Sequence, residues 1–206
     1  MRDQAPDQQY VVFRLTTDLE LTEREREMIP HLIEAAKEMD AVFWMQAYGG
    51  ERDSLLAFAQ SDAVRSYIEL NYGPWDRLAG DSTFVLGEGP RPAGANFYPA
   101  DMTRDEFDTA VAASPELGEE LRSLYTIVRR GDDGSLTAVP YHDAYAEQHE
   151  AAARHIQMAA ELAEDPGLRR YLELRAEALL SDDYQPSDMA WMDMKNNRIE
   201  FVVGPI

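Results

Sequence analysis

The residues from Asn71 to Thr103 form a long stretch without helical periodicity, in a chain whose flanking segments are strongly helical in pattern. The stretch holds five glycines and four prolines. Loops longer than ~12–15 residues are uncommon in compact domains. This one also carries aromatic side chains, which disordered segments seldom do: Tyr72, Trp75, Phe84, Phe97 and Tyr98. We therefore predict an ordered loop over 71–103 that packs onto its own helices through these aromatics.

Composition limits the classes of partner. The 206 residues are 45% hydrophobic, which is typical of a globular protein, and they include 39 acidic against 19 basic side chains, giving a formal charge of −20. Such a charge repels phosphate backbones and argues against nucleic acid as a partner. The chain has no cysteine, no signal peptide and no membrane-span pattern. We expect a cytoplasmic protein without a membrane partner.

Helical patterns cover the first third of the chain. Thr22 and Glu25 form a capping box, and the apolar spacing that follows predicts a helix over Thr22–Ala47. Pro30 lies inside this helix and predicts a kink or a later start. A second helical pair is predicted over about Glu51–Leu70, broken near Ser61.

The rest of the chain predicts further helices and a few strands. A second capping box at Thr103 predicts a helix to Ala113, and Gly131–Gly134 lies at the tip of a β-hairpin. Helices from Pro140 to Ala163 and from Asp165 to Leu180 would form an antiparallel helical hairpin. The segment YVVFRL, at residues 10–15, reads as a short strand or an extended lead-in, and RIEFVVGPI, at residues 198–206, is a strand candidate.

These elements predict a mainly α fold with a small β component. It is a helical lobe with a helical hairpin, a β-hairpin and a terminal strand. The terminal strand is apolar and has no partner in the chain, whereas most protein chains end in polar residues. We therefore interpret residues 1–206 as a single partial domain of a longer protein, with an exposed apolar face that favours self-association or a missing C-terminal part.

The string HEAAARH, from His149 to His155, looks like a zinc helix. Two histidines bind one ion from a regular helix when they are spaced i and i+4. The spacing of six turns the second imidazole by about 240° and lifts it about 9 Å, so this pair cannot share an ion. Alternating steps of three and four residues instead predict a seam, the face along which this helix packs on a neighbouring helix. The seam consists of His142, Tyr145, His149, Ala152, Ile156, Ala159 and Ala163. His31 reads as a surface residue.

Other motifs are weaker. The chain has no G-x-S-x-G, and GEGPRPAG, at residues 87–94, lacks the lysine of a phosphate loop. Four acids near the end lack calcium-loop spacing and read as solvated caps rather than cation ligands: Asp182, Asp183, Asp188 and Asp193. These residues by themselves specify no reaction.

Several long strings together resemble bacterial proteins of the dipeptidyl peptidase III family of zinc metallopeptidases, including the branch similar to the peptidase-like part of plant Nudix-fusion proteins. The strings are NYGPWDRL, RPAGANFYPADMT, LYTIVRR, VPYHDAYAEQ, AEDPGLRRYLELRAEALLSDDY and AWMDMKNNRIEFVVGPI, and the likeness begins at about Tyr10. The resemblance implies a two-lobed peptidase whose N-terminal part is represented here.

In that family a later H-E-x-x-x-H helix and a later glutamate hold the zinc, and the resemblance places both outside this chain. It implies no cofactor and no metal ligand here, no catalytic residue, and no peptidase activity for the chain alone. It also implies that a strand at the end of this region lines the cleft, where a glutamate binds the free amino group of the substrate. Glu200 matches that position. The alternative is that Glu200 binds nothing and is a solvent-facing residue of a strand in which polar and apolar side chains alternate. A tyrosine expected two positions later is Val202.

The sequence therefore favours the N-terminal, non-zinc section of a dipeptidyl-peptidase-III-like metallopeptidase that contributes to a cleft for peptide substrates. The alternative is a stand-alone, non-catalytic peptide-binding or protein-interaction module that kept the lobe and lost the chemistry. A phosphate hydrolase has little support, because no Nudix-type glutamate cluster is visible.

Overall fold

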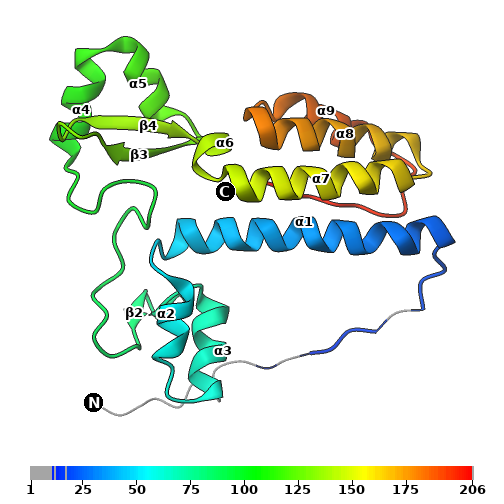
Figure 1. Ribbon diagram of the computed structural model, residues 1–206, viewed down its shortest axis with the longest axis horizontal. Helices are drawn as coiled ribbons and strands as arrows, with labels where there is room; N and C mark the ends of the chain where they lie inside the picture. Colours follow the sequence, from blue (N-terminus) through cyan, green and yellow to red (C-terminus); the bar gives the residue numbers. More distant parts are fainter. Residues whose placement is uncertain (1–10, 12, 17, 206) are drawn as a thin grey trace. The chain divides into compact units, whose positions relative to one another are not determined.

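The computed structural model describes residues 11, 13–16 and 18–205, and the chain divides into two compact units. The first unit is formed mainly by Trp44–Ala100, and the second combines Leu19–Phe43 with Asp101–Ile206. Figure 1 labels most of their helices and strands. Most elements are helices and both small sheets are hairpins, so the fold is mainly α with a small β component. Within the described residues, no helix is long and apolar enough to cross a membrane.

Helix α1 (Glu23–Ala47) begins where the capping box predicts. The Thr22 backbone N–H donates to Glu25 Oε2 at 2.8 Å, and the Glu25 N–H donates back to the Thr22 hydroxyl at 3.1 Å. Pro30 lies inside the helix without delaying its start, so the expected later start is wrong. Met28 and Leu32 are buried on either side of the proline, and this packing offsets the lost backbone hydrogen bond.

The first unit contains α2 (Arg52–Ala57) and α3 (Asp62–Asn71), which confirm the predicted helical pair. The Ser61 hydroxyl caps α3 by accepting a hydrogen bond from the Val64 N–H at 3.3 Å. The core of this unit consists of four buried side chains, with partly buried aromatics packed around them. They are Trp44, Leu55, Leu56 and Ile68.

Most of the long loop belongs to this first unit. It forms a two-residue antiparallel pair, β1 (Trp75–Asp76) with β2 (Ser82–Thr83), which the sequence pattern did not reveal. The Trp75 indole N–H donates to the Gly89 carbonyl at 2.8 Å. Further along, Asn96 donates from its backbone to the Gln46 carbonyl at 3.0 Å and from its side chain to the Met45 carbonyl at 2.8 Å. The loop therefore caps the last carbonyls of α1.

In the second unit, α7 (Ala146–Leu162) and α8 (Pro166–Ser181) form the predicted antiparallel hairpin, visible side by side in Figure 1. Asp165 caps α8 by accepting from the Leu168 N–H at 2.8 Å, and Pro166 occupies the first turn. Small side chains are buried along both helices. They include Ala152, Ala153, Ala159, Ala160 and Ala176.

The β-hairpin of the second unit also confirms its prediction. β3 (Thr126–Arg130) pairs with β4 (Leu136–Pro140) around a turn in which Gly134 has a φ of 84°. Helix α5 (Pro115–Arg122) packs on it in a buried cluster of Leu121, Val128 and Leu136, and α4 (Arg104–Ala113) adds partly buried side chains to this cluster. The sequence analysis did not identify α5, although Ser114 caps it and Pro115 opens it.

The predicted helix from Pro140 to Ala163 is wrong in its continuity. It is split into α6 (Tyr141–Ala144) and α7, because Tyr145 has φ −125° and ψ 29° and leaves the helical conformation. The ring of Tyr145 is buried between those of Tyr141 and His149, with centroids 5.4 and 5.9 Å away. Tertiary packing of this ring outweighs the local helical preference.

The predicted strand over residues 198–206 is also wrong for the described part, 198–205, which follows a drawn-out path without strand pairing (Figure 1). A strand requires a hydrogen-bonded neighbour, and the described chain places none beside this segment. A helix that the sequence analysis missed, α9 (Gln185–Asp193), precedes it and packs on α8. For the other predicted strand, residues 11 and 13–15 form none, and Tyr10 and Val12 lie outside the described residues.

Candidate functional site

The two histidines of α7 have different partners. His149 is fully buried, and its Nδ1 lies 2.7 Å from the Leu179 carbonyl oxygen of α8. Burial lowers the pKa of this imidazole, so it stays neutral in the seam. The His155 ring instead faces His31 of α1, with centroids 5.9 Å apart. His31 is half-buried beside this ring rather than fully exposed.

His142 and Asp182 join α6 to the end of α8. Asp182 ends α8 in a left-handed conformation, with φ 59°, and its Oδ2 lies 2.7 Å from His142 Nδ1. The same oxygen accepts from the His142 backbone N–H at 3.1 Å. Asp182 is therefore a capping and bridging residue, but its side chain is only 11% exposed, so the prediction that it is solvated is wrong. His142 has the local hydrogen bonds expected of a seam residue.

The donor set of the described residues does not fit a catalytic zinc ion. Such an ion takes three protein ligands of the His, Cys, Asp or Glu type. Within the part of the chain that the structure describes, no three such side chains come close enough together to hold a metal ion. We therefore assign no step of zinc chemistry to these residues.

The segment that carries Glu200 alternates between inward and outward side chains. Val203 is buried, while Ile199 and Phe201 are half-buried. Glu200 is exposed, and Val202 is 70% exposed. An extended backbone has this period of two, so the carboxylate and Val202 face solvent from one side of an unpaired extended segment.

The start of this segment is held by the first turn of α1. The Arg198 guanidinium pairs with the Glu25 carboxylate and donates to the Glu20 carbonyl at 3.1 Å. The hydrogen bond from Arg198, followed by that from the Thr22 N–H, lowers the pKa of Glu25. The capping box of α1 therefore also fixes the chain just before Glu200.

The other end of the segment lies against a buried arginine that the sequence analysis missed. Arg175 is only 7% exposed and pairs with Asp188 of α9. A signal for it was present, because Arg175 lies on the apolar face of α8 that also holds Leu168, Tyr171 and Leu179. A charged residue on such a face is seldom buried without a specific partner.

A shallow cleft of about 400 Å³ lies elsewhere in the second unit, between α4 and β4. Its floor is apolar, from Ala110, Ala113 and Leu136, and Asp105 and Glu106 stand at its rim. None of the residues that the sequence analysis selected lines it. The Glu106 carboxylate is already engaged by Arg130, at 2.6 Å. We assign this cleft no role in the candidate site.

Two solved structures are similar to this chain over most of its length. Dipeptidyl peptidase III from Caldithrix abyssi matches with a TM-score of 0.80 and 42% identity, covering 86% of this chain and 34% of that protein. Dipeptidyl peptidase III from Corallococcus sp. strain EGB matches with a TM-score of 0.85 and 33% identity, covering 94% of this chain and 37% of that protein.

A plant protein is also similar. Nudix hydrolase 3 of Arabidopsis thaliana is 26% identical over 241 aligned positions, covering 90% of this chain and 31% of the plant protein. No protein-family model matches. The chain therefore spans about a third of the length of each of these relatives, and the fold similarity together with 33–42% identity supports the family resemblance stated from the sequence.

Proposed function

From its likeness to about a third of dipeptidyl peptidase III, we propose that this chain is the N-terminal, non-zinc section of a metallopeptidase of that kind. In this proposal residues 198–205 line the substrate cleft, and the Glu200 carboxylate binds the free α-ammonium group of a peptide. Residues 1–206 then form one partial domain of a longer polypeptide, which supplies the zinc and the catalytic glutamate. The section contributes substrate binding, and this chain alone cleaves no peptide.

The observation that carries the proposal is the outward placement of Glu200 on an extended and unpaired segment. Such a segment can hydrogen-bond an extended peptide by strand addition, in which the backbone contributes affinity and alternate side chains contribute specificity. Because Glu200 and Val202 face the same way, a peptide lying beside the segment would meet both of them.

Charge supports the same reading. A carboxylate forms a charge-assisted hydrogen bond with an ammonium group, and the formal charge of −20 attracts cationic peptide ends while repelling phosphate. Val202 provides apolar contact but no hydroxyl. We therefore expect recognition of the amino terminus to depend on Glu200 rather than on a polar group at position 202.

The test is equilibrium dialysis of the chain with a fluorescent tetrapeptide whose amino terminus is either free or acetylated. We expect the free peptide to bind about fivefold more tightly than the acetylated one, because an exposed ion pair contributes up to ~1 kcal/mol. The Glu200→Gln variant should lose this preference and bind both peptides alike.

The matched control is Glu119→Gln, which removes an exposed carboxylate of α5. It should keep the preference for the free amino terminus, since Glu119 lies outside the extended segment. Equal binding of the two peptides by the unmodified chain, or loss of the preference in both variants, would contradict the role of Glu200.

The absence of a converging donor set within the described residues also suits a second function, a stand-alone peptide-binding or protein-interaction module. Both functions predict peptide binding. They differ for a longer polypeptide that begins with this chain: only the peptidase section predicts zinc-dependent release of dipeptides from that polypeptide, with Glu200→Gln raising KM more than it lowers kcat.

A further inference from the structure

Arg175 is a buried cation whose contacts converge on the end of the extended segment. It projects from the middle of α8, is 7% exposed, and pairs with the Asp188 carboxylate, which is itself 55% exposed. A buried charge is costly unless it is paired and packed. The pairing with Asp188 partly offsets this cost, and the remaining faces of the guanidinium are covered by aromatic rings.

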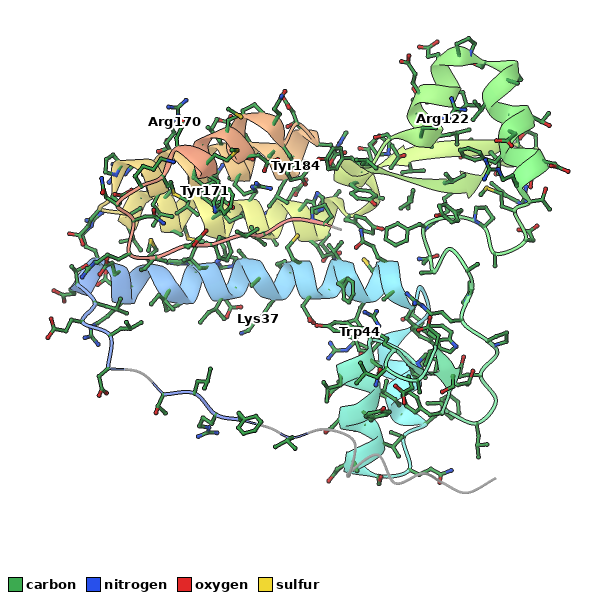
Figure 2. The ribbon with its side chains drawn as sticks, turned by 180° about the vertical axis from the view of Figure 1, so that it is seen from behind. Lys37, Trp44, Arg122, Arg170, Tyr171 and Tyr184 are labelled. Atoms are coloured by element: carbon green, nitrogen blue, oxygen red, sulfur yellow. The ribbon has the colours of Figure 1, made fainter. Side chains whose placement is uncertain are left out.

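Two tyrosines enclose the guanidinium. Its central carbon lies 5.4 Å from the ring centroid of Tyr171 and 5.2 Å from that of Tyr184, within the range of cation–π attraction. Burial raises the pKa of both phenols, so the rings remain neutral. Tyr125, just before β3, stacks on Tyr184 with centroids 4.9 Å apart. Figure 2 labels Tyr171 and Tyr184, which lie near each other in the helical part of the second unit.

Gly204 lies beside this stack, with room for about one methyl group between them. A methyl group added at Gly204 would be 3.6 Å from Arg175 Nη1 and 3.6 Å from Tyr184 Cε1, which is ordinary van der Waals contact. The preceding residue, Val203, is 7% exposed. The stack of Tyr171, Arg175 and Tyr184 therefore forms a seat for Val203 and Gly204.

The seat determines which way Glu200 faces. In an extended chain a shift of one residue moves every side chain to the opposite face. With Val203 inward, Phe201 and Ile199 are also inward, and Val202 and Glu200 face solvent. Arg198 holds the segment at its other end through Glu25, so only four residues, 199–202, lie between the two fixed points.

We propose that Arg175 is a positioning residue for peptide recognition: its stack with Tyr171 and Tyr184 seats Val203 and Gly204 and so keeps Glu200 facing the peptide. This inference rests on the proposed role of Glu200 and adds the group that orients it. In this proposal Arg175 acts on the segment and makes no contact with the peptide. Its replacement should release the register of residues 199–204 and leave the helical hairpin folded, because Asp188 remains half-exposed to water.

The chain contains no cysteine, so a single introduced thiol reports the register directly. We expect the Val203→Cys thiol to react with a maleimide dye roughly tenfold or more slowly than the Val202→Cys thiol, because the first is buried and the second exposed. Adding Arg175→Met, which keeps an unbranched apolar side chain, should bring the two rates close together. Arg175→Lys, which lacks the planar guanidinium that stacks on the rings, should do so in part.

Arg170→Lys is the matched control on the same helix. Arg170 is exposed and is labelled in Figure 2, so its replacement should leave both labelling rates unchanged. The dialysis experiment supplies the functional readout: Arg175→Met should reduce the roughly fivefold preference for the free amino terminus to near equality, although Glu200 is intact, while circular dichroism shows an unchanged helix content. If Arg175→Met unfolds the chain, Arg175→Lys and Asp188→Asn replace it in both measurements. Each should narrow the difference between the labelling rates at positions 202 and 203 and weaken the preference for the free amino terminus.

The outcomes separate the two claims. If the unmodified chain prefers the free amino terminus and the Arg175 variants keep both that preference and slow labelling at position 203, the seat is overturned and the role of Glu200 stands. If the unmodified chain shows no preference, the role of Glu200 and the positioning of it by Arg175 both fall, and the labelling rates then report only the path of the segment.

Discussion

His149 shows at the scale of one residue how burial decides what an imidazole can do. Its ring is fully enclosed between α7 and α8, and its Nδ1 is 2.7 Å from the Leu179 carbonyl. The hydrogen bond to Leu179 favours the charged ring, but loss of solvation is the larger effect and lowers the pKa. The residue that looked like a metal ligand in the sequence is a neutral part of a helix seam.

The lowered pKa of His149 predicts a pH dependence of stability. Above pH 6.5, the ordinary histidine value, the ring is neutral in both states and its contribution is fully present. As the pH falls below 6.5 and then through the lower pKa of the folded state, the unfolded chain binds the proton more readily and this contribution is lost. We expect the free energy of unfolding in urea to fall between pH 7.5 and 5.5, and to fall less in His149→Gln.

His155→Gln is the comparison for this measurement, because it removes a half-buried imidazole from the same helix. Its stability should decline with acid as the unmodified chain does. A decline that is equally steep in His149→Gln would show that His149 is not the group responsible.

At the scale of elements, the long loop depends on a close approach between Gly49 and Asn96. Gly49 has a φ of 73°, and a methyl group built there would lie 2.5 Å from Asn96 Cγ. Asn96 is the residue whose backbone and side chain donate to the last carbonyls of α1. Glycine is therefore required here both for its backbone conformation and for the space beside it.

We expect Gly49→Ala to destabilise the chain by about 1–3 kcal/mol, because it strains the backbone and displaces the capping asparagine. Urea unfolding would measure the change, and limited proteolysis within Gly87–Gly94 should become faster. Gly89→Ala is the matched control, since a methyl group there meets no atom within 4 Å. Cleavage of the unmodified loop as fast as in an unfolded control would contradict its ordering by these contacts.

At the scale of the whole molecule, the distribution of metal donors determines the chemistry that this chain can perform alone. Its four histidines are His31, His142, His149 and His155. His31 faces His155, and His142 and His149 have separate partners in Asp182 and the Leu179 carbonyl. The zinc implied for the relatives would then be held by polypeptide other than these residues.

We expect the purified chain to take up no stoichiometric zinc during dialysis against micromolar zinc, measured by elemental mass spectrometry, and to release no dipeptide from a chromogenic substrate. A longer polypeptide that includes the relatives' remaining two thirds should do both. Tight zinc uptake by this chain that is lost in His155→Gln would refute the geometric argument and point to the His31–His155 pair as ligands.

Much of the fold could be read from the sequence because its signals are local. Capping pairs such as Thr22 with Glu25, the Asp165–Pro166 start of α8 and the glycine turn at 131–134 each act within a few residues. They gave the first long helix, the second helix of the helical hairpin and the turn of the β-hairpin nearly as observed, whereas the first helix of the helical hairpin begins later than predicted, at Ala146. The geometric argument that His149 and His155 cannot share an ion needed only the rise and rotation of a helix.

The remaining features depended on contacts between residues far apart in the sequence. Tyr145 leaves the helix because its ring packs on Tyr141 and His149, and residues 198–205 form no strand because no neighbouring strand is there to pair with them. The seat at Arg175 exists only once α8, α9 and the extended segment come together. The sequence by itself determined the helices with clear local caps, the glycine turn and the candidate carboxylate. The tertiary structure decided where α6 and α7 separate and which way that carboxylate faces, since side-chain orientation follows from packing.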